Sequence, residues 1–583
     1  MKISRIKINN FRGIKEADLL LPDHGVFIGD NNTGKTSVLE AIDLVLGPDR
    51  MNRKSVIDEH DFFGGNYLTE EIKIEVYVTN LNQEQERHFY DQIEFWDTKE
   101  DELYSEANPA GVDEGHIVTA LRVLFVGRYD EEEDDFYGET YYSSSYTDKD
   151  SAKFRKKDKF HCGFLYLRSL RTGTRALSLE SGSLLDIILR NKELQLKVWE
   201  KTISELNSIT LASDPDLVVS GVLDSISEAL KKYVPKEWGT SPKLKVSNLT
   251  REELRKVITA FISTGVDGHS APFYRQGTGS VNLLVLAMLS QIAADKQNVI
   301  FAMEEPETAI PPHTQKRIVH EIRKLSSQTL FTSHSPYVLE EFKIEETVVL
   351  SRDESGKLEQ NRIVLPQTVK EKRYRQEFRT RFCEALLSRK VLIAEGSTET
   401  QSFPAMCRRL YELNPEIYSP IEALGVCVIN AGGETNIADM AEMYSDLGKQ
   451  VFAICDKQDA SEEAKITAVV DKLFMHQESS FEELVLNNTP QSAVDAYAAN
   501  LSWPQYFIDK YKTPETQASV ALAEYFSKNK ADYAIADFLY QLSETDMPQW
   551  LKNKALELKS ICEPIEETVE VVAEQDTENE TQQ

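Results

Sequence analysis

The residue types of a phosphate-binding loop occur at positions 26–42, VFIGDNNTGKTSVLEAI. An apolar run ends at Gly29, and Gly34, Lys35 and Thr36 complete the pattern G-x-x-x-x-G-K-[ST] just before a helical pattern begins. Glycines let backbone N–H groups surround a phosphate, and a helix N-terminus attracts anions. The lysine reaches the β- and γ-phosphates, and the threonine can bind Mg²⁺. The predicted ATP-binding residues of this loop are Gly29, Asn31, Asn32, Gly34, Lys35, Thr36 and Ser37.

Two later apolar runs end in side chains that can act on a γ-phosphate. NVIFAMEEPE leads to Glu304 and Glu305, so one carboxylate can join the Mg²⁺ shell and the next can orient the attacking water. TLFTSHSP places His334 where a γ-phosphate sensor would lie, although a lone histidine is more often structural. Between the phosphate loop and these two runs, QGTGS precedes an apolar helical pattern and has the composition of an anion-binding nest. Its predicted nucleotide contacts are Gln276, Gly277, Gly279 and Ser280.

A second set of acids follows apolar runs in the C-terminal half. RKVLIAEGSTE ends at Glu395, with Glu399 one helical turn later, and KQVFAICDKQD ends at Asp456, with Asp459 close by. SSFEELVL adds Glu482. The carboxyl ends of parallel strands line one crevice, so these acids can converge around a cation, and hard oxygen ligands favour Mg²⁺ or Mn²⁺. We predict metal ligation by Glu395, Asp456, Asp459 and Glu482. The alternative is that each acid only caps a strand or helix.

The elements that must position these residues are those of a mixed α/β protein. Strand patterns occur in KISRIKINNF, GVFIG, EIKIEVYV and IVTALRVLFV, and TSVLEAIDLVLG has helical spacing. A helical pattern covers 183–263, and the region after about 500 is also helical. The acidic Tyr/Ser-rich stretch near 129–150 predicts a long surface loop. A basic stretch at 370–382 predicts either a DNA-contacting segment or a solvated amphipathic helix.

Length, net charge, cysteine spacing and apolar runs limit the classes of protein to which this sequence can belong. The 583 residues suffice for about three or four domains. A net charge of −30 argues against coating nucleic acid through the overall field, though not against a local DNA site. None of the six cysteines forms a CxxC pair. No apolar run approaches the roughly 18 residues of a membrane span, and the N-terminus lacks a signal-peptide core. We expect a cytoplasmic chain with no membrane partner.

The order of the first set of motifs resembles the ABC-type ATPases of the structural-maintenance-of-chromosomes, Rad50 and RecF group. INNFRGI resembles the first strand of that group, which implies a nucleotide contact for Arg12. The resemblance also implies that Gly279 and Ser280 act on the ATP of a second subunit, so that a dimer is required. Only about 80 helical residues separate the two halves of the ATPase, which argues against a long coiled-coil arm.

The second set of acids resembles the Toprim domain, which has Glu-Gly after one strand and Asp-x-Asp after another. Here Gln458 stands at the second Asp position and Asp459 is one residue late, which leaves open whether one or two metal ions bind. An ABC-type ATPase followed by Toprim resembles the overcoming lysogenization defect (OLD) family of ATP-dependent nucleases, which includes the nuclease subunit of the Gabija antiphage system. The resemblance implies a catalytic lysine, for which the candidate is Lys530, beside Lys528.

These patterns predict an ATP-regulated, metal-dependent DNA endonuclease in antiphage defence. The implied partners are DNA, a homodimer or homotetramer, and a helicase encoded alongside. The alternative is a RecF-like, ATP-switched DNA clamp or sensor whose degenerate Toprim domain recruits another protein. The expected domains are an ABC-type ATPase at 1–182 and 264–369, a helical insertion at 183–263, a basic linker at 370–387, a Toprim domain at 388–500, a helical region at 501–562 and an acidic tail at 563–583.

Overall fold

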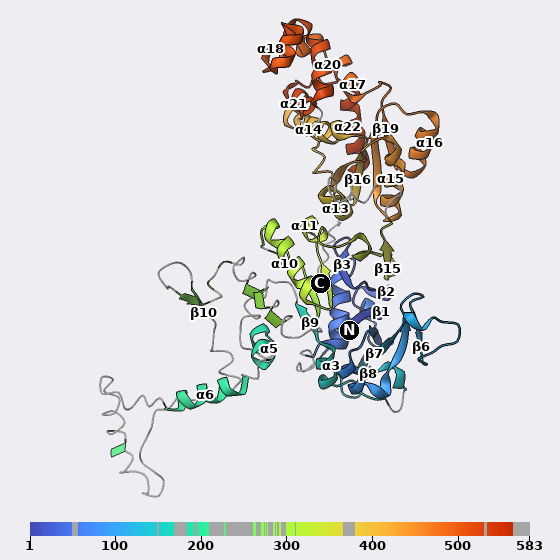
Figure 1. Cartoon of the computed structure of the whole chain (residues 1–583), viewed down its shortest axis with the longest axis vertical. Coiled ribbons are helices and arrows are strands. Elements are labelled where there is room, and N and C mark those ends of the chain that lie inside the picture. Colours follow the sequence, from blue (N-terminus) through green and yellow to red (C-terminus); the bar gives the residue numbers. More distant parts are fainter. Residues whose placement is uncertain are drawn as a thin grey trace, which may run out of the picture. The chain divides into compact units, whose positions relative to one another are not determined.

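The computed structural model divides the chain into two compact units, Met1–Ile363 and Val364–Gln583, which we describe separately (Figure 1). Among the described helices, none is long and apolar enough to cross a membrane. The described residues are 1–48, 56–147, 151–167, 183–191, 195–208, 261–263, 270–272, 299–308, 310–364, 379–529 and 533–563, with a few single positions between 225 and 292.

A 13-stranded mixed sheet forms the first unit, in the order β6-β5-β7-β4-β1-β2-β15-β14-β3-β13-β12-β9, with β8 paired to β7. Its strands are β1 (Lys2–Phe11), β2 (Ile14–Leu20), β3 (His24–Ile28), β4 (Ile72–Thr79), β5 (Glu94–Asp97), β6 (Glu102–Tyr104), β7 (Ile117–Asp130), β8 (Asp135–Tyr142), β9 (Phe164–Leu167), β12 (Ile300–Glu304), β13 (Gln328–Thr332), β14 (Thr347–Arg352) and β15 (Lys357–Arg362). The helices of this unit that we use are α1 (Lys35–Leu46), α2 (Gln83–His88), α3 (Lys156–Cys162), α5 (Leu184–Asn191), α6 (Gln195–Ser208), α10 (Pro312–Leu325) and α11 (Pro336–Leu339).

The core of this unit lies between α1 and the sheet. The apolar residues of α1 recur at helical spacing and are buried, as the sequence predicted. On β4, Ile72, Ile74, Val76 and Val78 alternate with more polar residues and share the buried face. Burial of these two apolar faces fixes α1, and therefore the loop before it, against the parallel part of the sheet.

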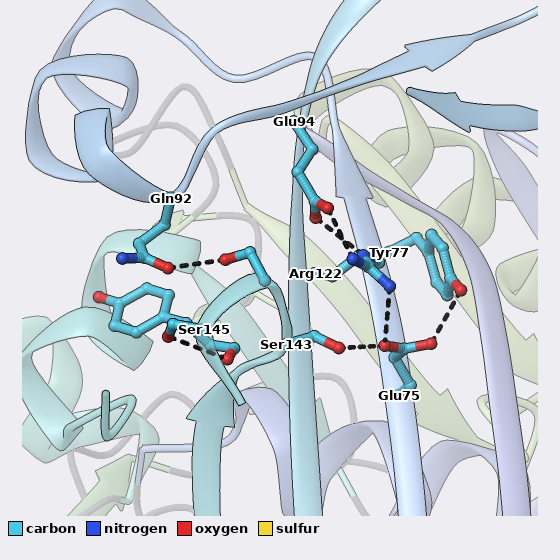
Figure 2. A network of polar contacts seen from close by, with 9 residues as sticks. Glu75, Tyr77, Gln92, Glu94, Arg122, Ser143 and Ser145 are labelled. Atoms are coloured by element: carbon cyan, nitrogen blue, oxygen red, sulfur yellow. Dashed lines mark hydrogen bonds and ion pairs between the residues drawn. The ribbon is translucent and has the colours of Figure 1, made fainter. Parts of the chain in front are cut away.

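A polar network ties the antiparallel strands together away from that core (Figure 2). Arg122 on β7 donates from Nε and Nη2 to the two carboxylate oxygens of Glu94 on β5, at 2.8 and 2.6 Å. It also lies 3.4 Å from Glu75 on β4. The hydroxyls of Tyr77 and Ser143 donate to the same Glu75 carboxylate. Because each acid is matched by donors, this is a structural network of the sheet.

Two secondary-structure predictions were wrong. The stretch near 129–150 is not a long loop, because β8 pairs with β7 in an antiparallel hairpin whose turn contains Asp134 at φ 51°. The aromatic residues of β8 favour a strand, and they outweighed the acids of the turn. The helical pattern of 183–263 holds for α5 and α6, but Phe261–Ser263 forms β10, which pairs with β11 (Ser270–Pro272).

The second unit contains a four-stranded parallel sheet in the order β17-β16-β18-β19. Its strands are β16 (Lys390–Ala394), β17 (Val426–Asn430), β18 (Gln450–Cys455) and β19 (Lys472–Met475). Strands β16 and β18 are nearly continuous apolar runs, as expected for parallel strands covered on both faces. The helices are α13 (Arg379–Leu387), α14 (Ser397–Leu413), α15 (Ile437–Asp446), α16 (Ala460–Val469), α17 (Phe481–Asn487), α18 (Gln491–Asn500), α19 (Gln505–Tyr511), α20 (Ala518–Lys528), α21 (Ala534–Gln541) and α22 (Gln549–Cys562). The predicted mixed α/β class with a helical C-terminal region is confirmed.

Candidate active sites

The predicted nucleotide site lies at the carboxyl ends of three adjacent parallel strands. Strand β3 pairs with β13, and β13 pairs with β12, all in parallel. The phosphate loop follows β3, His334 follows β13, and Glu304 ends β12. Because parallel strands end at one edge, segments about 300 residues apart in the chain come together there.

The phosphate loop has the backbone that its glycines allow. Gly29 adopts φ +148°, and a Cβ there would lie 2.4 Å from the carbonyl oxygen of Leu350. Gly34 precedes α1 at φ +113°. Lys35 is buried, and its ammonium donates to the carbonyl oxygens of Gly29 and Asp30 at 2.9 and 2.7 Å. Thr36 is exposed. The lysine therefore occupies the loop and must exchange these carbonyls for phosphate oxygens when nucleotide binds.

This lysine interacts electrostatically with Glu305, just after β12, and with His334, just after β13. Burial lowers the pKa of Lys35, and Glu305 opposes that shift. Burial and the Lys35 ammonium lower the pKa of His334, again opposed by Glu305. Glu305 has φ 43°, a left-handed backbone that is costly for a non-glycine residue. Glu304 accepts a hydrogen bond from the Tyr166 hydroxyl. Lys35, Glu305 and His334 therefore interact electrostatically at this edge of the sheet, and a joint action on phosphate stays a prediction.

Glu307, in the loop after β12, forms hydrogen bonds to the loop after β13. The sequence patterns did not identify this role. Its Oε1 accepts hydrogen bonds from the Ser333 hydroxyl at 2.9 Å and from the His334 backbone N–H at 2.8 Å. Its Oε2 is buried and has no hydrogen-bond partner among the described residues. Burial raises the pKa of Glu307. The only sign of Glu307 in the sequence is its position in EEPE, two residues after Glu305.

Several predicted nucleotide contacts are not placed against this site. Arg12, at φ 52°, pairs with Glu40 and donates from Nε to Asp61 at 2.8 Å, so a contact with nucleotide stays a prediction. Three of the four predicted residues of the QGTGS segment, Gln276, Gly279 and Ser280, lie outside the described residues; Gly277 is described and is exposed.

The second candidate site lies at the carboxyl ends of β16, β18 and β19, which are adjacent and parallel. Glu395 follows β16 and Asp456 follows β18, as the sequence predicted. The Oε2 atom of Glu395 accepts hydrogen bonds from the Asp456 backbone N–H at 3.1 Å and from the Gln458 side-chain amide at 3.0 Å. Burial, with a further contribution from Asp456, raises the pKa of Glu395. The structure therefore brings the first and second acidic patterns together.

The other predicted acids have different surroundings. The Glu399 carboxylate is buried and accepts from the Gly396 N–H at 2.9 Å, and burial raises the pKa of Glu399 to about 7. Glu482 is buried and accepts from the Thr398 hydroxyl at 3.2 Å. Asp459 is exposed and caps α16 by accepting from two backbone N–H groups. Metal ligation by Glu482 and Asp459 stays a prediction, and Lys530 lies outside the described residues.

His476 lies at the same edge and was missed by the sequence patterns. It directly follows β19, its side chain is 1% exposed, and its Nε2 is 2.9 Å from Asp456 Oδ1. Neither atom has a hydrogen-bond partner among the described residues. The only signal was the three-residue apolar run Leu473–Met475 before this histidine, which is too short to identify a strand by itself.

The donor atoms at this edge fit a hydrated divalent ion. The Oδ1 atom of Asp456 is buried and has no hydrogen-bond partner among the described residues, and burial together with Asp456 raises the pKa of the neighbouring Glu395. No group of three or more His, Cys, Asp or Glu side chains placed to hold a metal occurs in the described part of the chain. An ion held by two protein donors and several waters is the usual arrangement for Mg²⁺.

Two models of known protein families match this chain. A family model described as an AAA ATPase domain matches residues 1–339, more than half of the chain, and the chain belongs to that family. A second model, described as an overcoming lysogenization defect protein-like Toprim domain, matches residues 386–457. The combination confirms the resemblance to the OLD family.

Individual similar proteins cover very different shares of the chain. The Old nuclease of Escherichia phage P2 is 21% identical over 486 residues, which cover 78% of this chain and 77% of that protein. An uncharacterised protein of Mycobacterium tuberculosis is 46% identical over 59 residues, and the match spans 10% of this chain and 7% of that protein. A solved structure of the C-terminal region of the Burkholderia pseudomallei OLD protein is 14% identical, covers 30% of this chain and 99% of that chain, and has a TM-score of 0.22.

Proposed function

We propose that this protein is an ATP-regulated, metal-dependent DNA endonuclease that acts in antiphage defence. The observation that carries the proposal is the junction of Glu395 and Asp456 at adjacent strand ends, in one chain with a complete phosphate loop. Its similarity to the phage P2 Old nuclease supports DNA as the substrate.

Each residue of the second site has a role in this proposal. Glu395 and Asp456 would hold a Mg²⁺ or Mn²⁺ ion, which supplies charge stabilisation and a more acidic bound water when present. Gln458 fixes the orientation of Glu395 by donating to its Oε2. Because its pKa is about 7, Glu399 can exchange a proton near neutral pH, as a general acid or base requires. Lys530 would stabilise the charge on the phosphate.

The first site would control the second through nucleotide. Lys35 and Thr36 would bind the phosphates and the Mg²⁺ of ATP, Glu304 would join that Mg²⁺ shell, and Glu305 and His334 would act on the γ-phosphate. The residues Gly279 and Ser280 would complete the site from a second copy, so we propose a homodimer or homotetramer. A helicase partner, as in the Gabija comparison, is part of the same proposal.

The test is cleavage of supercoiled plasmid with Mg²⁺ or Mn²⁺, with and without ATP. We expect nicking or cutting that is lost in Glu395→Ala, and a changed ATP response in Lys35→Ala. Exposed Glu442, in the same unit, gives the control Glu442→Ala, which should cleave normally. Cleavage that survives Glu395→Ala would remove the second site from the reaction.

One observation favours the alternative of a clamp or sensor. Gln458 stands where a carboxylate is expected. Its side-chain amide already donates a hydrogen bond to the Glu395 carboxylate. In that case the purified protein hydrolyses ATP and binds DNA but cleaves none under any metal condition. Intact ATPase activity without cleavage is therefore the result that favours the alternative.

A further inference from the structure

His476 is a buried ring at the second site for which the reaction above has no use. Its side chain is 1% exposed and is flanked by Phe481 and Trp550, whose ring centroids are 6.2 and 5.5 Å away. Neither ring nitrogen has a hydrogen-bond partner among the residues that the structure describes. Buried polar atoms are nearly always satisfied, so an imidazole with two unsatisfied nitrogens indicates a missing ligand.

The Nε2 atom of this ring faces a second unsatisfied atom. It lies 2.9 Å from Oδ1 of Asp456, which is buried and has no hydrogen-bond partner. The two atoms are in close ion-pair contact, but no hydrogen bond joins them in the described part of the chain. Two ligand atoms that are each about 2.1 Å from an ion, at adjacent octahedral positions, lie about 3 Å apart. The observed separation therefore suits a shared ion.

We propose that His476 Nε2 and Asp456 Oδ1 bind the same divalent ion, which makes the metal site a mixed nitrogen–oxygen site. This inference rests on the proposed function, because it assumes an ion at Asp456. Imidazole is a weak ligand for Mg²⁺ and a good one for transition ions, so His476 shifts the preference of the site toward Mn²⁺ and later ions. Glu395 stays the further protein ligand of the proposed site, and water completes the shell.

The test uses the full-length, nucleotide-free protein with Mn²⁺ as the probe. High-field electron–nuclear double resonance is recorded on protein with unlabelled and with ¹⁵N-labelled histidine. We expect a nitrogen coupling that changes with the label and is absent in His476→Gln. Mn²⁺ binding should weaken about tenfold or more in that variant. The control is His320→Gln, which changes an exposed histidine in the other unit and should leave both signals unchanged.

The outcomes separate this inference from the proposed function. Bound Mn²⁺ that is lost in Asp456→Asn but shows no histidine nitrogen coupling overturns the ligand role of His476 and leaves the metal site in place. Mn²⁺ binding that does not depend on Asp456 overturns both. The isotope comparison is made on the unmodified chain, so a poorly folded His476 variant does not weaken it.

Discussion

At the scale of the residue, Gly29 is the position where the phosphate loop tolerates least change. An alanine there would meet the Leu350 carbonyl at 2.4 Å and would have to adopt φ +148°. We expect Gly29→Ala to cost about 1–3 kcal/mol or more of local strain and to abolish ATP binding. Gly115→Ala is the control, since its nearest contact is an ordinary 3.5 Å. Fluorescent-nucleotide titration measures the effect, and normal binding by Gly29→Ala would contradict it.

The buried carboxyl of Glu399 gives a prediction about pH. Its pKa is raised to about 7, so between the ordinary value of 4.5 and 7 the folded state binds a proton that the unfolded state has released. The stabilising contribution is complete below about pH 4.5 and is lost as the pH rises through about 7, a loss of about 3 kcal/mol.

Replacing this carboxyl with an amide should remove that loss. We expect Glu399→Gln to match the parent near pH 4.5 and to melt at a higher temperature at pH 8, measured in EDTA so that no ion shifts the titration. Glu442→Gln changes an exposed carboxyl and should show the parental pH profile. Equal melting temperatures for the parent and Glu399→Gln at pH 8 would refute the assignment.

At the scale of the element, the loops after β12 and β13 are held together by a buried polar network. Glu307 accepts from Ser333 and from the His334 backbone, and Ser335 donates to Gln315 of α10 at 2.7 Å. Gln315 in turn donates to the Ile310 carbonyl at 2.7 Å. The network therefore fixes the distance between the acidic strand end and the predicted phosphate sensor.

Removing Glu307 should uncouple these two loops. In Glu307→Ala, the Ser333 hydroxyl and the His334 N–H lose their acceptor, and His334 is no longer held toward the phosphate. We expect kcat for ATP hydrolysis to fall by about tenfold or more with a smaller change in ATP affinity, because phosphate-loop binding is untouched. Exposed Glu321, on α10, provides the control Glu321→Ala. A purely structural role would instead lower both kcat and affinity.

At the scale of the whole molecule, the charge of −30 sets how DNA can bind. The overall field repels the phosphate backbone, so attraction must come from local positive groups and bound ions. We expect DNA binding, measured by fluorescence anisotropy with a duplex, to be weak in EDTA and to recover with Mg²⁺. Asp456→Asn should reduce that recovery by about tenfold. Strong binding in EDTA would show that a basic part of the sequence, such as 370–382, carries the affinity.

The sequence by itself determined which local motifs carry the chemistry proposed for both sites. The phosphate loop was recognisable because a glycine-dependent backbone, a helix start and a lysine must occur within eight residues. Glu395 and Asp456 were recognisable because each ends an apolar run long enough to be a buried strand. These are local patterns, and short-range spacing is what a sequence displays directly.

Only the tertiary structure decided which distant residues meet. Glu307 reaches His334 because β12 and β13 are neighbours, and His476 reaches Asp456 because β19 lies beside β18. Such contacts depend on strand order and register, which the spacing of residues along one chain does not encode. The hairpin of β7 and β8 was misjudged for a local reason: the acids of its turn suggested a loop, although the aromatic residues of β8 favour a strand.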